Sequence, residues 1–124
     1  MSNPAPGFEK HPDHSVEITP FDGTVSVSVN GEEIARSSNA LQLAEAKYPL
    51  VFYVPVSDLP EEKLVKSDHQ TYCPFKGNAG YYDLVHAGQT NENAVWTYSD
   101  PYDEAIAIKD HVAFYANVAD VKPV

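Results

Sequence analysis

The residues best suited to chemistry lie close together in residues 71–82, which read Thr-Tyr-Cys-Pro-Phe-Lys-Gly-Asn-Ala-Gly-Tyr-Tyr. This segment contains the only cysteine of the chain, a lysine, two glycines and four aromatic rings. Thiols and amines act as nucleophiles or bind anions, and aromatic rings commonly line small-molecule sites. No other segment concentrates such side chains, so residues 71–82 are the first candidate for a functional site.

Cys73 has two interpretations. As a thiolate nucleophile it would need Lys76 to lower its pKa and His69 to act as a base, which makes Cys73 and His69 the candidate catalytic residues. Free cysteine is also among the most buried residue types, and a packing role needs no such partners. The sequence favours packing and predicts that native Cys73 reacts slowly with a thiol reagent.

Lys76 precedes Gly77, whose conformational freedom would let a turn present the lysine away from the core. There Lys76 could bind an anionic ligand, although the segment lacks the upstream glycine and the Ser or Thr of a phosphate-binding loop. The alternative is a surface lysine paired with Asp100 or Asp103. Both interpretations place the amine at or near the protein surface.

Aromatic residues later in the chain suggest a cleft near this segment. Trp96 and Tyr98 alternate onto one face of an expected strand, and Tyr102 follows a proline at an expected helix start. A tryptophan beside tyrosines and a lysine is a common lining of a small-molecule cleft, but the same rings could simply pack the core. The expected ligand-binding residues are Tyr72, Lys76, Trp96, Tyr98 and Tyr102.

Composition excludes several classes of partner. The chain has 8 basic and 18 acidic residues and a net charge of -10, which disfavours nucleic acid and anionic membranes. Its single cysteine excludes an intramolecular disulfide and zinc sites built on paired thiolates, and its histidines lack ligand spacing, so no metal or cofactor is expected. Because the N-terminus does not resemble a signal peptide and no long apolar run follows, the expected location is the cytoplasm.

The elements that must position the candidate site are mostly short strands. Residues 1–12 contain three prolines and few apolar groups, so we expect a disordered or extended tail before a single domain, 13–124. The expected strands are 16–19, 40–46, 50–56, 81–85, 95–98 and 111–115, with 50–56 central, a polar loop at 87–93 and short helices at 57–64 and 100–108. This spacing predicts an all-β fold, an antiparallel sandwich or curled sheet with two short helices.

Residues 25–36 give the clearest local pattern. Valines alternate before Asn30-Gly31, two residues that tolerate positive φ, and a second strand follows. The pattern predicts a type I′ hairpin with a two-residue loop. In that register Val29 faces Glu32, Val27 faces Ile34 and Val25 faces Arg36.

Several segments, in order, resemble the bacterial and fungal family known as domain of unknown function 427. They are residues 33–37, 53–55, 71–82, 94–98, 101–105 and 112–115, within a resemblance that spans about 16–121. The resemblance implies a β-tent-like fold in which two antiparallel sheets lean together. Many β-tent proteins bind zinc through two pairs of cysteines, which this chain lacks. The family's Pro-Arg-Glu-Asp is Pro55-Val56-Ser57-Asp58 here, so its arginine is absent.

Three functions are consistent with these patterns. The first is binding of a small anionic or cyclic molecule in an aromatic cleft with Lys76 at its rim. The second is a thiol-dependent enzyme that uses Cys73. The third is a structural interaction module, such as a homodimer formed through an exposed sheet edge. Alkylation of the thiol separates the first two, because a catalytic cysteine must be accessible and acidic.

Overall fold

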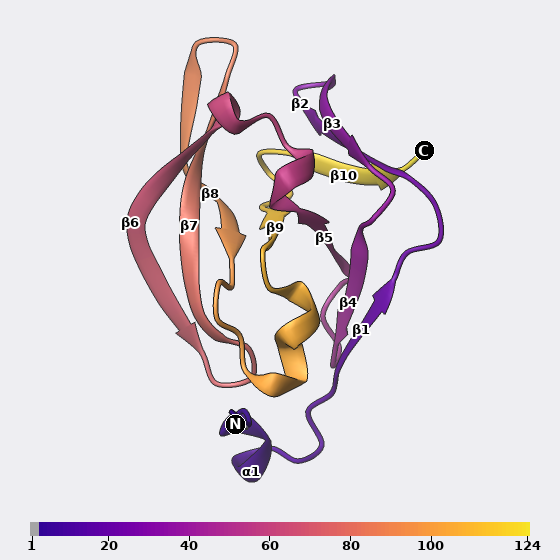
Figure 1. The fold of residues 1–124 in the computed structure, drawn as a ribbon, viewed down its shortest axis with the longest axis vertical. Coiled ribbons are helices and arrows are strands. Elements are labelled where there is room, and N and C mark those ends of the chain that lie inside the picture. The colour runs from indigo at the N-terminus through magenta and orange to yellow at the C-terminus, as the bar shows by residue number, and fades with distance from the viewer. Residues whose placement is uncertain (1–2) are drawn as a thin grey trace.

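Ten strands form two antiparallel sheets in the computed structural model, which describes residues 3–124 (Figure 1). The large sheet has the order β1 (Val16–Pro20), β4 (Leu41–Glu45), β5 (Val51–Pro55), β9 (His111–Phe114), β8 (Gln89–Thr97), β7 (Gly77–His86) and β6 (Leu64–Cys73). The small sheet has the order β10 (Asp120–Pro123), β2 (Val25–Val29) and β3 (Glu32–Ser37). The predicted mainly β fold with two antiparallel sheets is confirmed.

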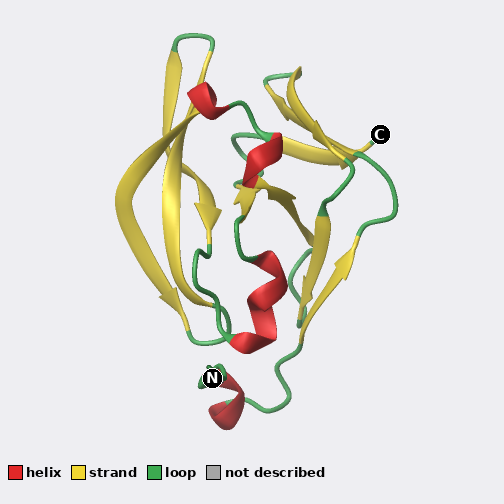
Figure 2. Cartoon of the chain, viewed as in Figure 1, coloured by secondary structure: helices red, strands yellow, loops and turns green. Residues whose placement is uncertain are grey.

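The helical segments are short: one precedes the first strand, and the others lie in connections between strands (Figure 2). The two helices expected from the sequence correspond to 3₁₀ segments: η1 (Val56–Asp58) and η2 (Glu61–Lys63) replace the first, and η3 (Asp103–Ile108) is the second. Prolines at 55, 60 and 101 precede or begin these segments, where the missing N–H is not needed. The expected central strand is confirmed, since β5 lies between β4 and β9.

The N-terminal residues make contacts where the sequence predicts a disordered or extended tail over residues 1–12. Gly7–Lys10 forms α1, at the opposite end of the molecule from the small sheet (Figure 1). The Gly7 N–H donates to the Pro74 carbonyl at 2.9 Å. A Cβ on Gly7 would lie 2.7 Å from the Phe75 ring, so glycine permits this close approach. Residues 1 and 2 of the predicted tail lie outside the described residues.

The predicted hairpin is present, but its register changes partway along. Asn30 and Gly31 have φ values of +51° and +83°, and Val29 pairs with Glu32 as predicted. A bulge then shifts the pairing, so that Val27 faces Ala35 and Val25 faces Ser37. The predicted pairs with Ile34 and Arg36 are therefore wrong by one residue, because alternation alone does not reveal an inserted residue in the partner strand.

The expected polar loop at 87–93 is also wrong. Only Ala87 and Gly88 form the turn, both with positive φ, and β8 starts directly at Gln89. Polar residues continue the strand because this end of the β7–β8 hairpin is largely exposed to solvent. The sequence analysis also missed β10 and most of β6.

The large sheet separates two hydrophobic clusters. The aliphatic cluster lies against the small sheet and includes Val25, Val27, Val54, Leu84, Val95 and Val112. The tyrosine cluster lies on the other face and includes Leu43, Tyr53, Tyr81, Tyr98, Ile108 and Ala113. Neighbouring residues of one strand enter different clusters because side chains alternate along a strand.

Candidate functional site

Residues 74–76 form the loop between β6 and β7, and Gly77 allows the loop to pack closely on the chain after β8. Gly77 has φ +118°, a conformation that residues with a side chain rarely adopt. A Cβ at this position would lie 3.6 Å from the Tyr102 nitrogen. The Tyr102 N–H donates to the Lys76 carbonyl at 2.9 Å, which ties the loop to the start of η3.

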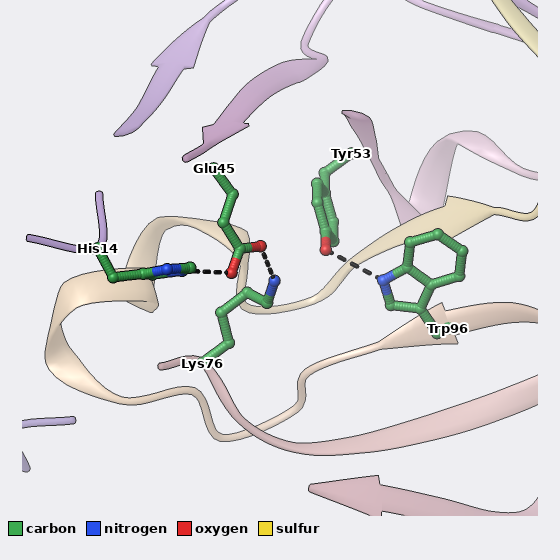
Figure 3. A network of polar contacts seen from close by, with 5 residues as sticks. All are labelled: His14, Glu45, Tyr53, Lys76 and Trp96. Atoms are coloured by element: carbon green, nitrogen blue, oxygen red, sulfur yellow. Dashed lines mark hydrogen bonds and ion pairs between the residues drawn. The ribbon is translucent and has the colours of Figure 1, made fainter. Parts of the chain in front are cut away.

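Lys76 points into the protein, so the predicted surface position is wrong. Its side chain is 11% exposed, and Nζ lies 2.5 Å from Oε1 of Glu45 on β4. The second oxygen, Oε2, lies 2.8 Å from Nε2 of His14 (Figure 3). The charged partner is therefore Glu45, not Asp100 or Asp103. A lysine this buried needs such a partner, because an unpaired charge is costly to remove from water.

Glu45 is held in its ionised form by the two basic side chains. Burial opposes ionisation of the carboxyl, but hydrogen bonds from Lys76 and His14 outweigh this effect. The pKa of Glu45 therefore lies below its ordinary value. The carboxylate in turn balances the charge of Lys76, so the ion pair presents little net charge to its surroundings.

A cavity of about 400 Å³ opens beside this ion pair, on the tyrosine-cluster face of the large sheet. We call it the tyrosine cavity. Glu45 and Lys76 contribute its charges, and Leu43, Pro49 and Val51 contribute its aliphatic wall. Its aromatic lining consists of Tyr48, Tyr53, Tyr81, Trp96, Tyr98 and Tyr115. This volume and this mixture of rings and a few polar groups are typical of small-molecule sites.

Tyr53 and Trp96 form a polar contact across the cavity wall. The indole Nε1–H of Trp96 donates to the Tyr53 hydroxyl at 3.0 Å (Figure 3). Burial raises the pKa of Tyr53 well above its ordinary value, although the Trp96 hydrogen bond acts in the opposite direction. Tyr53 consequently keeps its proton, and its O–H remains a donor after accepting from the indole.

The Tyr98 hydroxyl is a second neutral donor in the cavity. The residue is 6% exposed, and burial raises its pKa, with further increases from nearby groups that include Tyr53, Tyr81 and Glu45. Tyr98 lines the cavity together with these three neighbours. Its hydroxyl is not among the buried side-chain polar atoms of residues 3–124 that lack a partner.

Of the five predicted ligand-binding residues, the structure brings three together. Lys76, Trp96 and Tyr98 line the tyrosine cavity. Tyr72 and Tyr102 do not line it; instead their hydroxyls pair with each other at 2.8 Å on the exposed surface. Tyr72 is 55% exposed. Lys76, in the loop, therefore points inward, whereas Tyr72, near the end of β6, is exposed.

Cys73 and His69, the candidate catalytic pair, lie four positions apart on β6. A strand rises about 3.3 Å per residue, so this separation spans roughly 13 Å and exceeds direct hydrogen-bond reach. The His69 ring lies 4.6 Å from the ring of Tyr81, and Cys73 is half-buried beside the tyrosine cluster. His69 is thus not placed to deprotonate this thiol directly, and the reactivity of Cys73 stays a prediction for alkylation to test.

The five expected ligand-binding residues did not include Glu45, Tyr53, Tyr81, Tyr115 or His14, although Tyr81 lies in the candidate segment 71–82. One signal was available for Glu45: Leu41, Leu43 and Glu45 alternate on one face of β4, so a charge continues an apolar face. An inward-facing charge of this kind indicates a buried partner. His14 carried no such signal, because its contact depends on how the N-terminal residues fold back onto residues 74–76.

Among residues 3–124, none of the helices has the length and apolar character of a membrane span. Within the same residues, no group of three or more His, Cys, Asp or Glu side chains is placed to hold a metal ion.

The fold and the cavity define a small, mainly β domain with a tyrosine-lined cavity on one face of its large sheet. A comparison with protein families matches residues 17–124 to the family described as Domain of unknown function (DUF427), and the chain belongs to that family. The predicted family membership is therefore confirmed. A comparison with curated proteins gives no match.

Proposed function

We propose that this protein binds a small cyclic molecule in the tyrosine cavity. The observation that carries the proposal is the pair of phenols, Tyr53 and Tyr98, in the lining of a cavity of about 400 Å³. A ligand acceptor placed in this cavity could accept a hydrogen bond from one or both O–H groups. Trp96 adds a flat surface against which a ring can pack.

The charges of the cavity favour an uncharged ligand over an anionic one. Lys76 is the basic group in the cavity lining, and Glu45 already neutralises it. An anion would have to compete with that carboxylate and be placed near its negative charge. A ring with a carbonyl or similar acceptor would instead use the O–H groups of Tyr53 and Tyr98.

One edge of the large sheet is unsuited to the homodimer alternative. Strand β6 forms this edge, with β1 at the other, and it carries Lys66 and Asp68 together with a register shift between Lys66 and Gln70. Charges and bulges of this kind discourage pairing with another strand. A homodimer formed through β6 is therefore a weaker candidate than ligand binding in the cavity.

Titration of intrinsic fluorescence tests the proposal, because Trp96 is the only tryptophan of the chain and lines the cavity. The probes are N-methyl-2-pyrrolidone, a neutral ring with a carbonyl, and 2-pyrrolidone-5-carboxylate, a similar ring with a negative charge. We expect a saturable change with the neutral ring and binding at least severalfold weaker with the carboxylate.

Two tyrosine variants supply the matched control. Tyr98→Phe removes a hydroxyl inside the cavity and should weaken binding of N-methyl-2-pyrrolidone about tenfold, the equivalent of one hydrogen bond to a neutral group. Tyr72→Phe removes an exposed hydroxyl outside the cavity and should leave binding unchanged. A signal that does not saturate, or that both variants alter equally, would count against the proposal.

A further inference from the structure

The large sheet opens between β5 and β9, because these strands pair over a very short length. Their pairing consists of Val54 with Val112 and Pro55 with His111. On its other side β5 continues to pair with β4 as far as Val51. Residues 51–53 therefore have β4 as a neighbour on one side. On the other side they have no backbone pairing with β9.

Side chains bridge this opening where the backbone pairing has ended. Trp96 on β8 reaches Tyr53 on β5 through the 3.0 Å hydrogen bond from its indole nitrogen. The Tyr115 ring, just after β9, lies 4.7 Å from the Trp96 ring. The opening is thus bordered by aromatic side chains.

A second cavity, of about 310 Å³, lies on the other face of β5 at the same opening. Leu50 and Phe52 line it, whereas Tyr53 lines the tyrosine cavity, as alternation along the strand requires. Ala119 and Val121, from the end of the chain that forms the small sheet, contribute further apolar wall. The second cavity therefore lies between the two sheets.

The two cavities share part of their lining. Pro49, Val51, Trp96 and Tyr115 border both. Their chemistry differs: the tyrosine cavity has phenol donors and an ion pair, while the second cavity is mostly apolar. Its charged residues, Asp120 and Lys122, lie 3.8 Å apart and are both well exposed, so they leave the apolar wall uncharged.

We propose that the two cavities accommodate one elongated ligand, a polar ring in the tyrosine cavity that carries an apolar substituent extending into the second cavity. This inference rests on the proposed function and adds the class of ligand, an amphipathic molecule with a cyclic head and an aliphatic or aromatic tail. An elongated ligand that occupies both cavities would cross their shared border at Trp96 and Tyr115.

A homologous series of N-alkyl-2-pyrrolidones tests this ligand class. The N-methyl, N-butyl and N-hexyl compounds keep the same ring and lengthen only the tail, and each can be titrated against Trp96 fluorescence. Burial of a methylene should strengthen binding about threefold to fourfold. We expect this gain along the series until the tail fills the second cavity, where it should level off.

Two substitutions show where the tail binds. Ala116 is exposed and borders the second cavity, so Ala116→Phe should place a ring in the space for the tail. Asn117 is the adjacent exposed residue and borders neither cavity, which makes Asn117→Phe the matched control. Ala116→Phe should remove most of the gain of the N-hexyl compound while preserving N-methyl binding, and Asn117→Phe should change neither.

The outcomes separate this inference from the function on which it rests. If the N-methyl compound binds and Tyr98→Phe weakens it, but chain length has no effect, the proposed function stands and the two-cavity ligand is wrong. The same conclusion follows if Ala116→Phe and Asn117→Phe reduce the chain-length gain equally, because the tail then binds elsewhere. If no member of the series binds, both proposals are wrong.

Discussion

On β5, the neighbouring residues Tyr53 and Val54 face opposite sides of the large sheet and enter very different surroundings. Val54 is completely buried in the aliphatic cluster, under the small sheet. Tyr53 is also buried, but its hydroxyl accepts from Trp96 beside a cavity of about 400 Å³. Burial alone therefore does not distinguish the structural face from the candidate binding face.

The two faces differ in the kinds of side chain that they bury. Aliphatic side chains can fill space without needing partners, so the first face can pack without polar contacts. Phenols and charges need partners, and their geometry limits how closely the surrounding side chains can pack. The tyrosine face can hold a cavity because its groups are arranged around hydrogen bonds and an ion pair. The following predictions test this contrast.

The largest expected effect is on the aliphatic face. Leu84 is fully buried there, and Leu84→Ala should lower the free energy of unfolding by about 3 kcal/mol through lost burial and the cavity it leaves. Tyr98→Phe on the opposite face removes one hydroxyl and should cost less than about 1 kcal/mol. Urea unfolding measures both values, and equal losses would contradict the assignment of stability mainly to the aliphatic face.

A smaller loss is expected from the ion pair of the tyrosine face. Glu45→Gln leaves Lys76 buried without its carboxylate and should lower the free energy of unfolding by about 2 kcal/mol. The double variant Glu45→Leu with Lys76→Met removes both charges and should recover much of that loss.

The exposed pair of Glu33 and Arg36 provides a control for this experiment. Their side chains are 40% and 58% exposed, so Glu33→Gln should leave the urea midpoint unchanged. If Glu45→Gln also left the urea midpoint unchanged, the ion pair between Glu45 and Lys76 would contribute nothing to stability.

Acidification should gradually remove the contribution of Glu45 to the stability of the folded protein. The pKa of Glu45 is lowered in the folded state, so its contribution is fully present above the unfolded value, near 4.5, and is lost as pH falls through the folded value. Stability should therefore decline below about pH 4.5, and the decline should be shallower in Glu45→Gln. Urea midpoints at pH 7 and pH 4 measure the difference, and parallel declines would show that Glu45 does not contribute to it.

The smallest effect is expected at Tyr72 and Tyr102, whose paired hydroxyls lie outside the cavity. The hydrogen bond with Tyr72 is the main cause that raises the pKa of Tyr102, whereas burial is the main cause at Tyr98. Tyr102→Phe should therefore leave both the urea midpoint and Trp96 fluorescence unchanged. A large response of Trp96 would extend the binding site to this exposed pair.

Local patterns in the sequence predicted the parts of the fold that depend on neighbouring residues. Asn30-Gly31 specified the hairpin turn because few other residues adopt positive φ at two successive positions. The register beyond the turn was not predictable in the same way, since the bulge after Val27 depends on how β2 packs against its partners. Periodicity predicted most of the apolar strands, but not the polar start of β8, most of β6, β10 or the pairing partners.

Part of the site was predictable because it too depends on a local pattern. Trp96 and Tyr98 share a face by strand alternation, and the structure confirms that they line one cavity. Lys76 lies close to them only because β4 supplies Glu45, which is 31 positions away in the chain. Tyr102 is four positions beyond Tyr98 yet faces solvent, because the chain leaves β8 after Thr97 and turns toward η3. Proximity in sequence is thus a poor guide to membership of the cavity.

The N-terminal residues have a practical consequence for work on this family. The family match begins at residue 17, but His14 stacks on Phe75 at 3.8 Å between ring centres and bonds to Glu45. A shortened protein that starts at the family boundary would uncover the Phe75 ring and leave Glu45 with Lys76 alone. Ligand screens, crystallisation trials and fusion tags should therefore preserve residues 3–16, because a protein that starts at the beginning of the family match lacks a side chain that contacts the candidate site.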